Sequence, residues 1–288
     1  MNNALSVDIE DWYDSKIDKG RPPDYFKNCR FNFEGSVCNI LDFFAQNNVK
    51  ATFFILGSIG QRYPELINRI YRYGHEIACH GLRHEFIYRQ DREEFRKDIN
   101  LAKRILEDAS GARVLGFRAP SFSITKNSLW ALEIIRSLGF EYDSSISPSK
   151  NYLYGIPDSP DEPYNISIAK EFFLRELPQT TMRFFGVKIP FCGGFFLRVF
   201  PYRIVKFSIE SVNKNMIPAN IYFHPHEMES FPIPARMLSR ENIILNAGKK
   251  SLRKKIELLI RDFSFVPLRE IMKEIKIKRV VSLSQLSS

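Results

Sequence analysis

Short apolar runs alternate with segments of helical periodicity over the first half of the chain. The apolar runs predict strands at residues 4–9, 50–56, 75–79 and 113–119. Apolar residues spaced three and four apart predict helices over 35–48, 58–74, 91–111 and 125–139. Strands that alternate with helices indicate a parallel sheet with helical crossovers.

The second half of the chain has a less regular pattern. Residues 147–165 are rich in Pro, Ser and Tyr, which predicts a long loop. Strands or turns are predicted at 170–178 and 186–196, and a buried strand ending in histidines is predicted within 218–227. The last predicted elements are a helix, a short strand and a helix, at 248–263, 264–268 and 269–275.

No repeat or linker divides this pattern. We therefore expect one domain spanning residues 1–288, with long loops at about 147–200 and a basic helical region at about 248–281. A length of 288 residues suits a single α/β barrel. The chain is 44% hydrophobic and 14% aromatic, so it can bury a large core. These values exclude a disordered or fibrous chain.

The chain is basic, since 42 Lys and Arg against 33 Asp and Glu give a formal net charge of +9. Such a charge favours anionic partners, among them phosphate groups, membrane headgroups and nucleic acid. Basic residues concentrate at 248–257 and 273–279. A solvated helix face is the first interpretation of this C-terminal region, and contact with a membrane surface is the second. Nucleic-acid binding ranks last, because no zinc-finger or RNA-recognition motif is present.

The cysteines and the N-terminal sequence bear on the compartment. None of the four cysteines forms a C-x-x-C pair, so we expect no thiolate zinc site but buried thiols in a reducing environment. The first residues show no basic region followed by an apolar stretch and a cleavage site, and no apolar run reaches about 18 residues. We therefore expect a cytoplasmic protein, peripheral to the inner membrane.

Charged and histidine side chains follow several of the predicted strands. In parallel α/β folds the carboxyl ends of the strands meet at one edge, where functional residues gather. We expect these distant residues to converge there. They are Asp8, Glu10, Asp11, His80, His84, Arg118, His224 and His226.

Two carboxylates and two histidines from this set have the composition of a metal site. Asp8 and Glu10 alternate along one strand, so both side chains point to the same face. Two buried carboxylates repel each other unless a cation lies between them. His80 and His84 add two imidazoles, and Gly81 permits a turn between them. Two histidines with one carboxylate form a recurring catalytic site for zinc or ferrous iron, so we predict a divalent cation here.

Single residues of this set also have structural interpretations. His75 is expected to be a buried histidine bonded to the backbone, and Asp11 to be a turn residue. His226 suits a surface position and a supporting position equally well. Arg118 taken alone would be an ordinary ion-pair partner. The joint pattern is what favours a functional site.

Five segments in this order resemble the polysaccharide deacetylase family, which has NodB homology and forms carbohydrate esterase family four. They are LSVDIEDWY, GHEIACHGLRH, GFRAPSFSIT, YDSSISP and FHPHE. The resemblance is strongest to the branch found in exopolysaccharide loci and covers about residues 4–270. It implies a distorted, partly open (β/α)7 barrel. It also implies a metal-dependent hydrolase that removes an N-acetyl group from an amino sugar of a surface polysaccharide, or of its lipid- or nucleotide-linked precursor.

The resemblance assigns roles position by position. Asp8 matches the general base, and Arg118 matches the arginine of the R-x-P motif that holds this base. His80 and His84 match the paired metal ligands, and His224 matches the general acid. The expected metal is zinc, with cobalt, iron or nickel as alternatives.

The third metal ligand departs from the family pattern. The family's metal-binding aspartate directly follows the base, and Ile9 occupies that position here. Glu10 is the predicted ligand instead, with Asp11 as the alternative. After the R-x-P motif, Ser121 replaces the usual aromatic residue, and Phe122 follows one place later.

The resemblance also predicts substrate contacts, at Pro120, Phe122 and Phe195. Backbone N–H groups around Pro120 and Phe122 are expected to share the oxyanion, and Glu176 is expected to support His224. An N-acetylated sugar is the expected substrate, and aromatic residues on loops offer stacking surfaces for it or, more commonly, pack in the core. These aromatic residues are Tyr152, Tyr154, Tyr164, Phe195 and Phe196.

Two other functions stay open at this stage. The superfamily includes hydrolases of non-peptide C–N bonds in cyclic ureides or imides. A catalytically inactive carbohydrate-binding protein is the second alternative, and it gains weight if Ile9 marks a lost metal site.

Overall fold

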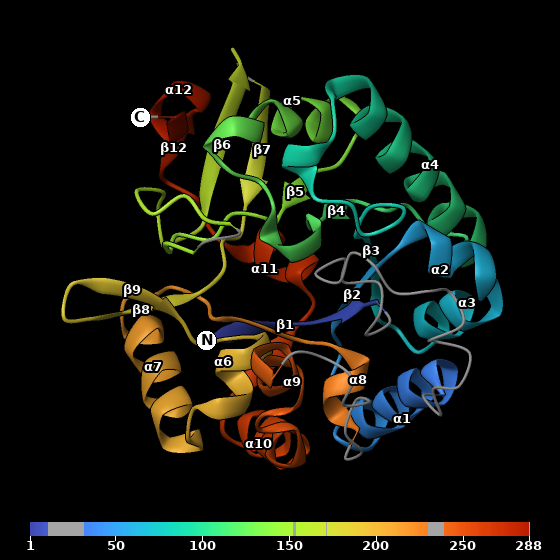
Figure 1. The fold of residues 1–288 in the computed structure, drawn as a ribbon, viewed down its shortest axis with the longest axis vertical. Helices are drawn as coiled ribbons and strands as arrows, with labels where there is room; N and C mark the ends of the chain where they lie inside the picture. Colours follow the sequence, from blue (N-terminus) through green and yellow to red (C-terminus); the bar gives the residue numbers. More distant parts are fainter. Residues whose placement is uncertain (11–31, 152–153, 171, 230–238, 288) are drawn as a thin grey trace.

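The computed structural model describes residues 1–10, 32–151, 154–170, 172–229 and 239–287 (Figure 1). The sequence predictions for Asp11, Cys29 and Tyr152 lie outside the described residues. The strands are β1 (Asn2–Ile9), β2 (Thr52–Ile55), β3 (Glu76–Cys79), β4 (Gly116–Phe117), β5 (Tyr142–Asp143), β6 (Tyr164–Ala169), β7 (Phe172–Glu176), β8 (Thr181–Phe184), β9 (Val187–Pro190), β10 (Asn220–Phe223), β11 (Ser264–Val266) and β12 (Val280–Ser282). The helices are α1 (Phe33–Gln46), α2 (Gly57–Arg62), α3 (Pro64–Arg72), α4 (Arg92–Ser110), α5 (Trp130–Ser137), α6 (Gly194–Val199), α7 (Tyr202–Lys214), α8 (Pro225–Met228), α9 (Ser239–Asn246), α10 (Lys249–Asp262), α11 (Leu268–Glu274) and α12 (Leu283–Ser287).

A curved sheet forms the centre of the molecule, and helices α1 to α5 lie outside it (Figure 1). Its strand order is β10-β1-β2-β3-β4-β5-β7-β6-β12, and β11 also pairs with β1. The pairs from β10 to β7 are all parallel, whereas β6 runs antiparallel to β7. Within the described ranges, β10 and β12 end this order and do not pair with each other, so the sheet is a distorted and partly open barrel. The predicted fold class is confirmed.

Strand β1 separates two environments by its side-chain alternation. Leu5, Val7 and Ile9 join the large apolar core between the sheet and the helices. Ser6 and Asp8 are buried on the other face, inside the barrel. Neighbouring strands β2 and β10 are buried throughout, as central parallel strands require.

Most predicted elements are present, with shorter bounds. Pro64 divides the predicted helix over 58–74 into α2 and α3, and the strand predicted over 113–119 is reduced to two residues in β4. The sequence patterns missed α7 entirely, as well as β12 and α12 beyond the helix that was expected to be the last. No helix within the described ranges is long and apolar enough to cross a membrane.

Helix α4 begins with a capping box. Asp91 Oδ1 accepts hydrogen bonds from the backbone N–H groups of Glu93 and Glu94, both at 2.8 Å, and Glu94 accepts from the N–H of Asp91 at 3.1 Å. Gly111 ends the helix in the left-handed region, at φ 69°. These contacts satisfy backbone donors that have no partner within the helix.

The variant Asp91→Ala is expected to lower the free energy of unfolding by about 1 kcal/mol, because two backbone donors lose their acceptor. Urea denaturation followed by circular dichroism measures the change. Asp108→Ala, at an exposed position near the other end of the same helix, is the matched control and should stay within about 0.5 kcal/mol of the unchanged protein. Equal losses in the two variants would contradict a capping role.

The basic C-terminal helix α10 is not the fully solvated face that was predicted. Lys250, Arg253 and Lys254 are exposed, but Lys249 and Lys255 are buried. The ammonium group of Lys255 donates to three backbone carbonyls at the end of α6. Part of the positive charge in this region therefore serves internal packing.

Candidate active site

Three side chains from separate parts of the chain meet at the carboxyl ends of β1 and β3. The ligand atoms of Glu10, His80 and His84 all lie within 4.8 Å of one another, and the three residues are buried. Glu10 directly follows β1, and the two histidines follow β3, which places them at one edge of the parallel sheet. The predicted convergence of these residues is thus present in the structure.

Asp8 is held by a buried arginine from β4's carboxyl end. Arg118 Nη1 donates to Asp8 Oδ1 at 2.7 Å and to Ser6 Oγ at 2.9 Å. Its Nη2 donates to Ser144 Oγ at 3.1 Å and to Asn220 Oδ1 at 3.3 Å, and its Nε donates to the Ser144 carbonyl at 3.3 Å. All donor nitrogens of this fully buried guanidinium therefore have partners, which fixes the orientation of the Asp8 carboxylate.

The loop after β3 sets the orientation of both histidines. Gly81 has φ 83°, so a left-handed turn follows His80, and His84 itself has φ 54°. His80 Nδ1 lies 2.8 Å from the carbonyl oxygen of Arg118. Because a carbonyl only accepts, Nδ1 carries the proton and Nε2 presents its lone pair. Burial lowers the pKa of His80 to about 4, so the ring is neutral near pH 7.

The carboxylate of Glu10 lies among imidazoles. Its Oε2 contacts His84 Nε2, and its Oε1 lies 3.2 Å from His224 Nε2. Burial would raise the pKa of Glu10, but the His84 and His224 rings outweigh burial and hold this pKa well below its usual range. Glu10 is therefore ionised.

The cluster fits a divalent cation. Glu10 Oε2 is buried without a hydrogen-bond partner in the described part of the chain, although it contacts a ring nitrogen of His84. A carboxylate oxygen and imidazole nitrogens that converge without hydrogen-bond geometry are the donor set that zinc or ferrous iron takes. Ile9 points into the apolar core, so the alternation of β1 leaves Glu10 on the side of the histidines.

His224 lies beside this cluster and is oriented from behind by Glu227. Its backbone N–H donates to Glu227 Oε2 at 2.9 Å, and its ring Nδ1 lies 3.0 Å from the same oxygen. Burial would lower the pKa of His224, but Glu227 and Glu10 outweigh burial and raise it to about 9. A cation held by Glu10 would oppose this rise by repulsion.

Glu227 lies in the FHPHE segment, and the sequence alone assigns it no role. The spacing of this segment could have revealed its role. A residue directly after a strand is followed by proline and, three positions on, by glutamate, which is the pattern of a capping box. The buried His226 stacks on His224, with ring centroids 5.3 Å apart. Burial lowers the pKa of His226 to about 3, so its neutral ring supports His224 rather than facing solvent.

His224, His226 and Glu227 also have the spacing of a metal-binding group. Both carboxylate oxygens of Glu227 are already engaged, however, Oε2 by His224 and Oε1 by the Arg198 guanidinium. We therefore treat Glu227 as a hydrogen-bonded support for His224, and His226 as a ring that stacks on it.

Aromatic rings pack beside His224. The Tyr222 ring lies 5.1 Å from the Phe122 ring and 5.9 Å from the His224 ring. Gly193 packs so closely on this tyrosine that an added Cβ would lie 1.8 Å from a ring atom, which excludes any side chain at this position. The half-buried Tyr154 ring lies 6.0 Å from Phe122.

The predicted substrate residues fall into two groups. Pro120 and Phe122 are buried in the loop that follows Arg118, next to these aromatic rings. Phe195 is half-buried on α6, and its described ring contact is with Phe196. Among the other aromatic residues considered from the sequence, Tyr164 is a fully buried core residue.

Glu176 does not support His224, contrary to the prediction. It lies opposite Asp143 in the register of β5 and β7, and its Oε1 accepts from the Ile146 N–H at 3.0 Å. Burial, together with the charge of Asp143, raises the pKa of Glu176 well above its usual range, and burial raises that of Asp143 to about 6. Both side chains are fully buried, so the charge of one carboxyl group opposes ionisation of the other, which favours the protonated form of Glu176.

Glu176→Gln is expected to flatten the pH dependence of stability. The folded protein keeps a proton that the unfolded chain releases above about pH 4.5, so the free energy of unfolding falls as pH rises, by up to about 1.4 kcal/mol per pH unit. Glutamine has a similar size and shape but does not titrate. Urea midpoints at pH 5 to 8 test this, and Glu141→Gln, at an exposed position nearby, should keep the steeper slope. Parallel slopes for all three proteins would refute a proton retained on Glu176.

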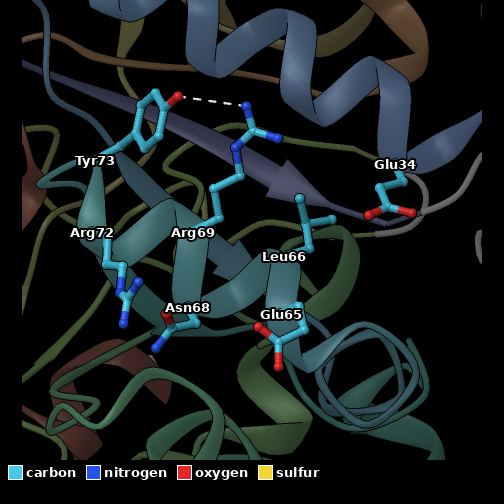
Figure 2. Close-up of a pocket in the computed structure, with 7 residues that line it drawn as sticks. All are labelled: Glu34, Glu65, Leu66, Asn68, Arg69, Arg72 and Tyr73. Carbon is cyan, nitrogen blue, oxygen red and sulfur yellow. Dashed lines mark hydrogen bonds between the residues drawn. The ribbon is translucent and has the colours of Figure 1, made fainter.

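Two further features are separate from the site. His75 is buried, accepts a hydrogen bond from the Ala51 N–H at 3.2 Å and packs on Phe53, as predicted for a structural histidine. A surface pocket of about 450 Å³ lies between α3 and the start of α1, and it shares no residue with the histidine–carboxylate cluster. Figure 2 shows the residues that line it. The pocket is lined by Glu34, Glu65, Leu66, Asn68, Arg69, Arg72 and Tyr73.

Fold and site together define an α/β barrel with a histidine–carboxylate centre at the carboxyl edge of its strands. Residues 26–142 match the family model for polysaccharide deacetylase, and residues 144–273 match a domain of unknown function, DUF3473. The similarity to the polysaccharide deacetylase model thus covers residues 26–142, which is less than half of the chain.

Two characterised relatives match shorter segments. A peptidoglycan-N-acetylglucosamine deacetylase of Bacillus cereus is 37% identical over 95 residues, which are 33% of this chain and 34% of the relative. A chitooligosaccharide deacetylase of Bradyrhizobium is 35% identical over 71 residues, which are 25% of this chain and 32% of the relative. The matched part thus spans about a third of the length of either relative.

Solved structures extend the similarity of fold to nearly the whole chain. A Mycobacterium smegmatis protein assigned to the polysaccharide deacetylases superposes with a TM-score of 0.65 at 20% identity, over 96% of this chain and 91% of that one. A mutant of a Bacillus anthracis CE4 family pseudoenzyme, with restored enzymatic activity, gives 0.50 at 14% identity, over 95% and 68%. At these identities the comparison shows the fold alone.

Proposed function

We propose that this protein is a metal-dependent hydrolase that removes an N-acetyl group from an amino sugar. The observation that carries the proposal is the convergence of Glu10, His80 and His84 beside the Asp8–Arg118 pair and His224. The names of the relatives, which are deacetylases of peptidoglycan and chitooligosaccharides, support this substrate class.

Glu10, His80 and His84 would hold the cation, with zinc as the first candidate. When bound, a divalent cation supplies a Lewis acid that polarises an acyl carbonyl and lowers the pKa of water toward about 7. The short distances from the Glu10 carboxylate to the two histidines support Glu10 as the third ligand.

The remaining steps belong to side chains of this protein. Asp8, held by Arg118, takes a proton as the water oxygen bonds to the acyl carbon. The C–N bond then breaks, and His224, held by Glu227, gives a proton to the leaving nitrogen. The products are acetate and a free amino sugar.

A backbone donor for the oxyanion is proposed at Ser121. The N–H of Phe122 donates to the Ala119 carbonyl at 3.0 Å, so it does not serve this role. Ser121 has φ 52°, in the left-handed region that is uncommon for residues other than glycine. Phe122 has the same φ of 52°, so the backbone turns sharply over these two residues, and the N–H of Ser121 is the one that we propose as the donor.

The sugar ring is proposed to stack on the aromatic surface formed by Phe122, Tyr154 and Tyr222. Because the net charge is +9, a lipid- or nucleotide-linked precursor that carries phosphate is the preferred form of the substrate. We further propose that the reaction takes place on the cytoplasmic side of the membrane, with the exposed lysines and arginine of α10 near its surface.

Acetate release from defined substrates tests the proposal. The purified protein, stripped with a chelator and then reloaded with zinc, cobalt or iron, would be offered chitooligosaccharides, a peptidoglycan fragment, a nucleotide-linked N-acetylamino sugar and a lipid-linked one. We expect activity only in the metal-loaded protein and the highest kcat/KM with a phosphate-bearing substrate. Activity confined to free polymer would show that the substrate is not a phosphate-bearing precursor, but it would still support deacetylase activity.

Two outcomes would favour the alternatives. Stoichiometric metal with turnover only of cyclic ureides or imides would indicate a hydrolase of other C–N bonds. Sugar binding without metal and without acetate release would indicate a carbohydrate-binding protein, and the similarity of fold to a CE4 pseudoenzyme makes this outcome worth measuring directly.

A further inference from the structure

Arg198 is a buried arginine that lies behind the His224–Glu227 pair. Its Nε lies 2.7 Å from Glu227 Oε1, and the side chains of both residues are at most 3% exposed. Glu227 therefore lies between the Arg198 guanidinium on one side and the His224 ring on the other. Burial would raise the pKa of Glu227, but His224 and Arg198 outweigh it and hold this carboxylate in its ionised form.

The other end of the guanidinium is bound by backbone carbonyls near the C-terminal end of α9. Its Nη1 donates to Leu245 O at 3.1 Å and Ala247 O at 2.7 Å, and its Nη2 donates to Ile244 O at 2.6 Å. Carbonyl groups at a helix C-terminus lack partners within the helix and carry partial negative charge, so they attract a cation. One side chain thus connects α9 to Glu227.

The backbone of Arg198 is fixed as firmly as its side chain. Lys255 of α10 donates from Nζ to the carbonyls of Leu197, Arg198 and Phe200, at 2.6, 2.9 and 2.6 Å. Gly248, between α9 and α10, lies so close that an added Cβ would be 2.3 Å from the Arg198 carbonyl oxygen. Helices α9 and α10 therefore hold α6 and its arginine in place from two directions.

We propose that Arg198 is a positioning residue for His224, acting through Glu227, and that the α9–α10 segment completes the acid side of the site. This inference rests on the proposed deacetylase function. Its physical basis is that a carboxylate shared between a fixed guanidinium and an imidazole has one position, whereas the same carboxylate without the guanidinium has several. A misplaced imidazole donates its proton to the leaving amine less efficiently.

The test compares substrates that differ in their need for an acid. An amino-sugar amide releases a poor leaving group, whereas 4-nitrophenyl acetate releases a phenolate that leaves without a proton from the enzyme. In Arg198→Met we expect kcat for acetate release from the amide to fall by about 10–100-fold with little change in KM, and ester hydrolysis to change less than about 3-fold. Arg198→Lys should be intermediate, because an ammonium cannot reach Glu227 and three carbonyls together.

Arg203→Met, at an exposed position on α7, is the matched control and should leave both reactions unchanged. Losses of equal size on the amide and the ester, in step with a lower thermal midpoint, would show that Arg198 is only structural. An unchanged amide rate in Arg198→Met would also overturn the proposal.

A readout that needs no activity separates this inference from the proposed function. The Nδ1 proton of His224, bonded to Glu227, should give a downfield proton resonance that is absent in His224→Gln. We expect this resonance to shift or broaden in Arg198→Met and to persist in Arg203→Met. If the unchanged protein cleaves neither substrate, the proposed function fails, and the resonance alone decides whether Arg198 positions His224. Its persistence in Arg198→Met would overturn the inference.

Discussion

Replacement of His80 by alanine is expected to remove the bound metal together with deacetylase activity. His80 is one of three ligand groups within 4.8 Å, and the Arg118 carbonyl fixes its tautomer. Loss of a residue that merely supports a metal ligand costs about 10–100-fold in metal affinity or activity, so loss of a ligand should exceed about 100-fold. Elemental analysis of the purified protein and kcat/KM for acetate release measure the two effects.

His75→Ala is the matched control for this variant. It removes another buried imidazole, from the opposite end of the same strand β3, and should lower thermal stability while stoichiometric metal is retained. If His80→Ala bound one metal ion per chain as tightly as the unchanged protein, the centre formed by Glu10, His80 and His84 would have to be abandoned.

Arg118→Met is expected to lower the free energy of unfolding by about 3–5 kcal/mol, because it leaves the Asp8 carboxylate buried without its cation. The same change leaves the base without the partner that orients it, so activity should fall even where the variant remains folded. Urea denaturation and acetate-release assays at a temperature well below the thermal midpoint measure the two losses.

A double variant distinguishes the ion pair from general packing. Asp8→Asn combined with Arg118→Met removes both charges, and its stability should exceed the sum expected from the two single changes, since neither charge is left unpaired. Strict additivity of the single and double variants would show that the buried pair is not coupled.

The helices and strands that could be predicted are those whose own residues show a clear apolar spacing. Strands β1 to β3 and helices α1 to α4 follow directly from such patterns, and Gly111 and the Asp91 capping box mark both ends of α4. Helix α7 was not predictable in this way, because Ile204 and Phe207 are exposed and so obscure the stripe formed by Val205 and Ile209. Strands of two residues, such as β4 and β5, carry too few positions to show any period.

Most of the site was predictable for a similar reason. Asp8, His80 and Arg118 lie at or just after strands whose carboxyl ends share one edge, so their convergence follows from topology. The support for His224 was assigned to Glu176, but the register of β5 and β7 directs that residue to Asp143. The contact of Glu227 with Arg198 joins residues on two helices whose relative placement no local pattern encodes.

Strand β5 has a consequence for experiments that dissect this protein. The two family matches end and begin at residues 142 and 144, yet Tyr142 and Asp143 are bonded in register to β4 on one side and to β7 on the other. A fragment cut there would expose an open strand edge, which invites aggregation. It would also separate Glu10 from His224, so neither half expressed by itself should be competent, and only their reassociation would restore turnover.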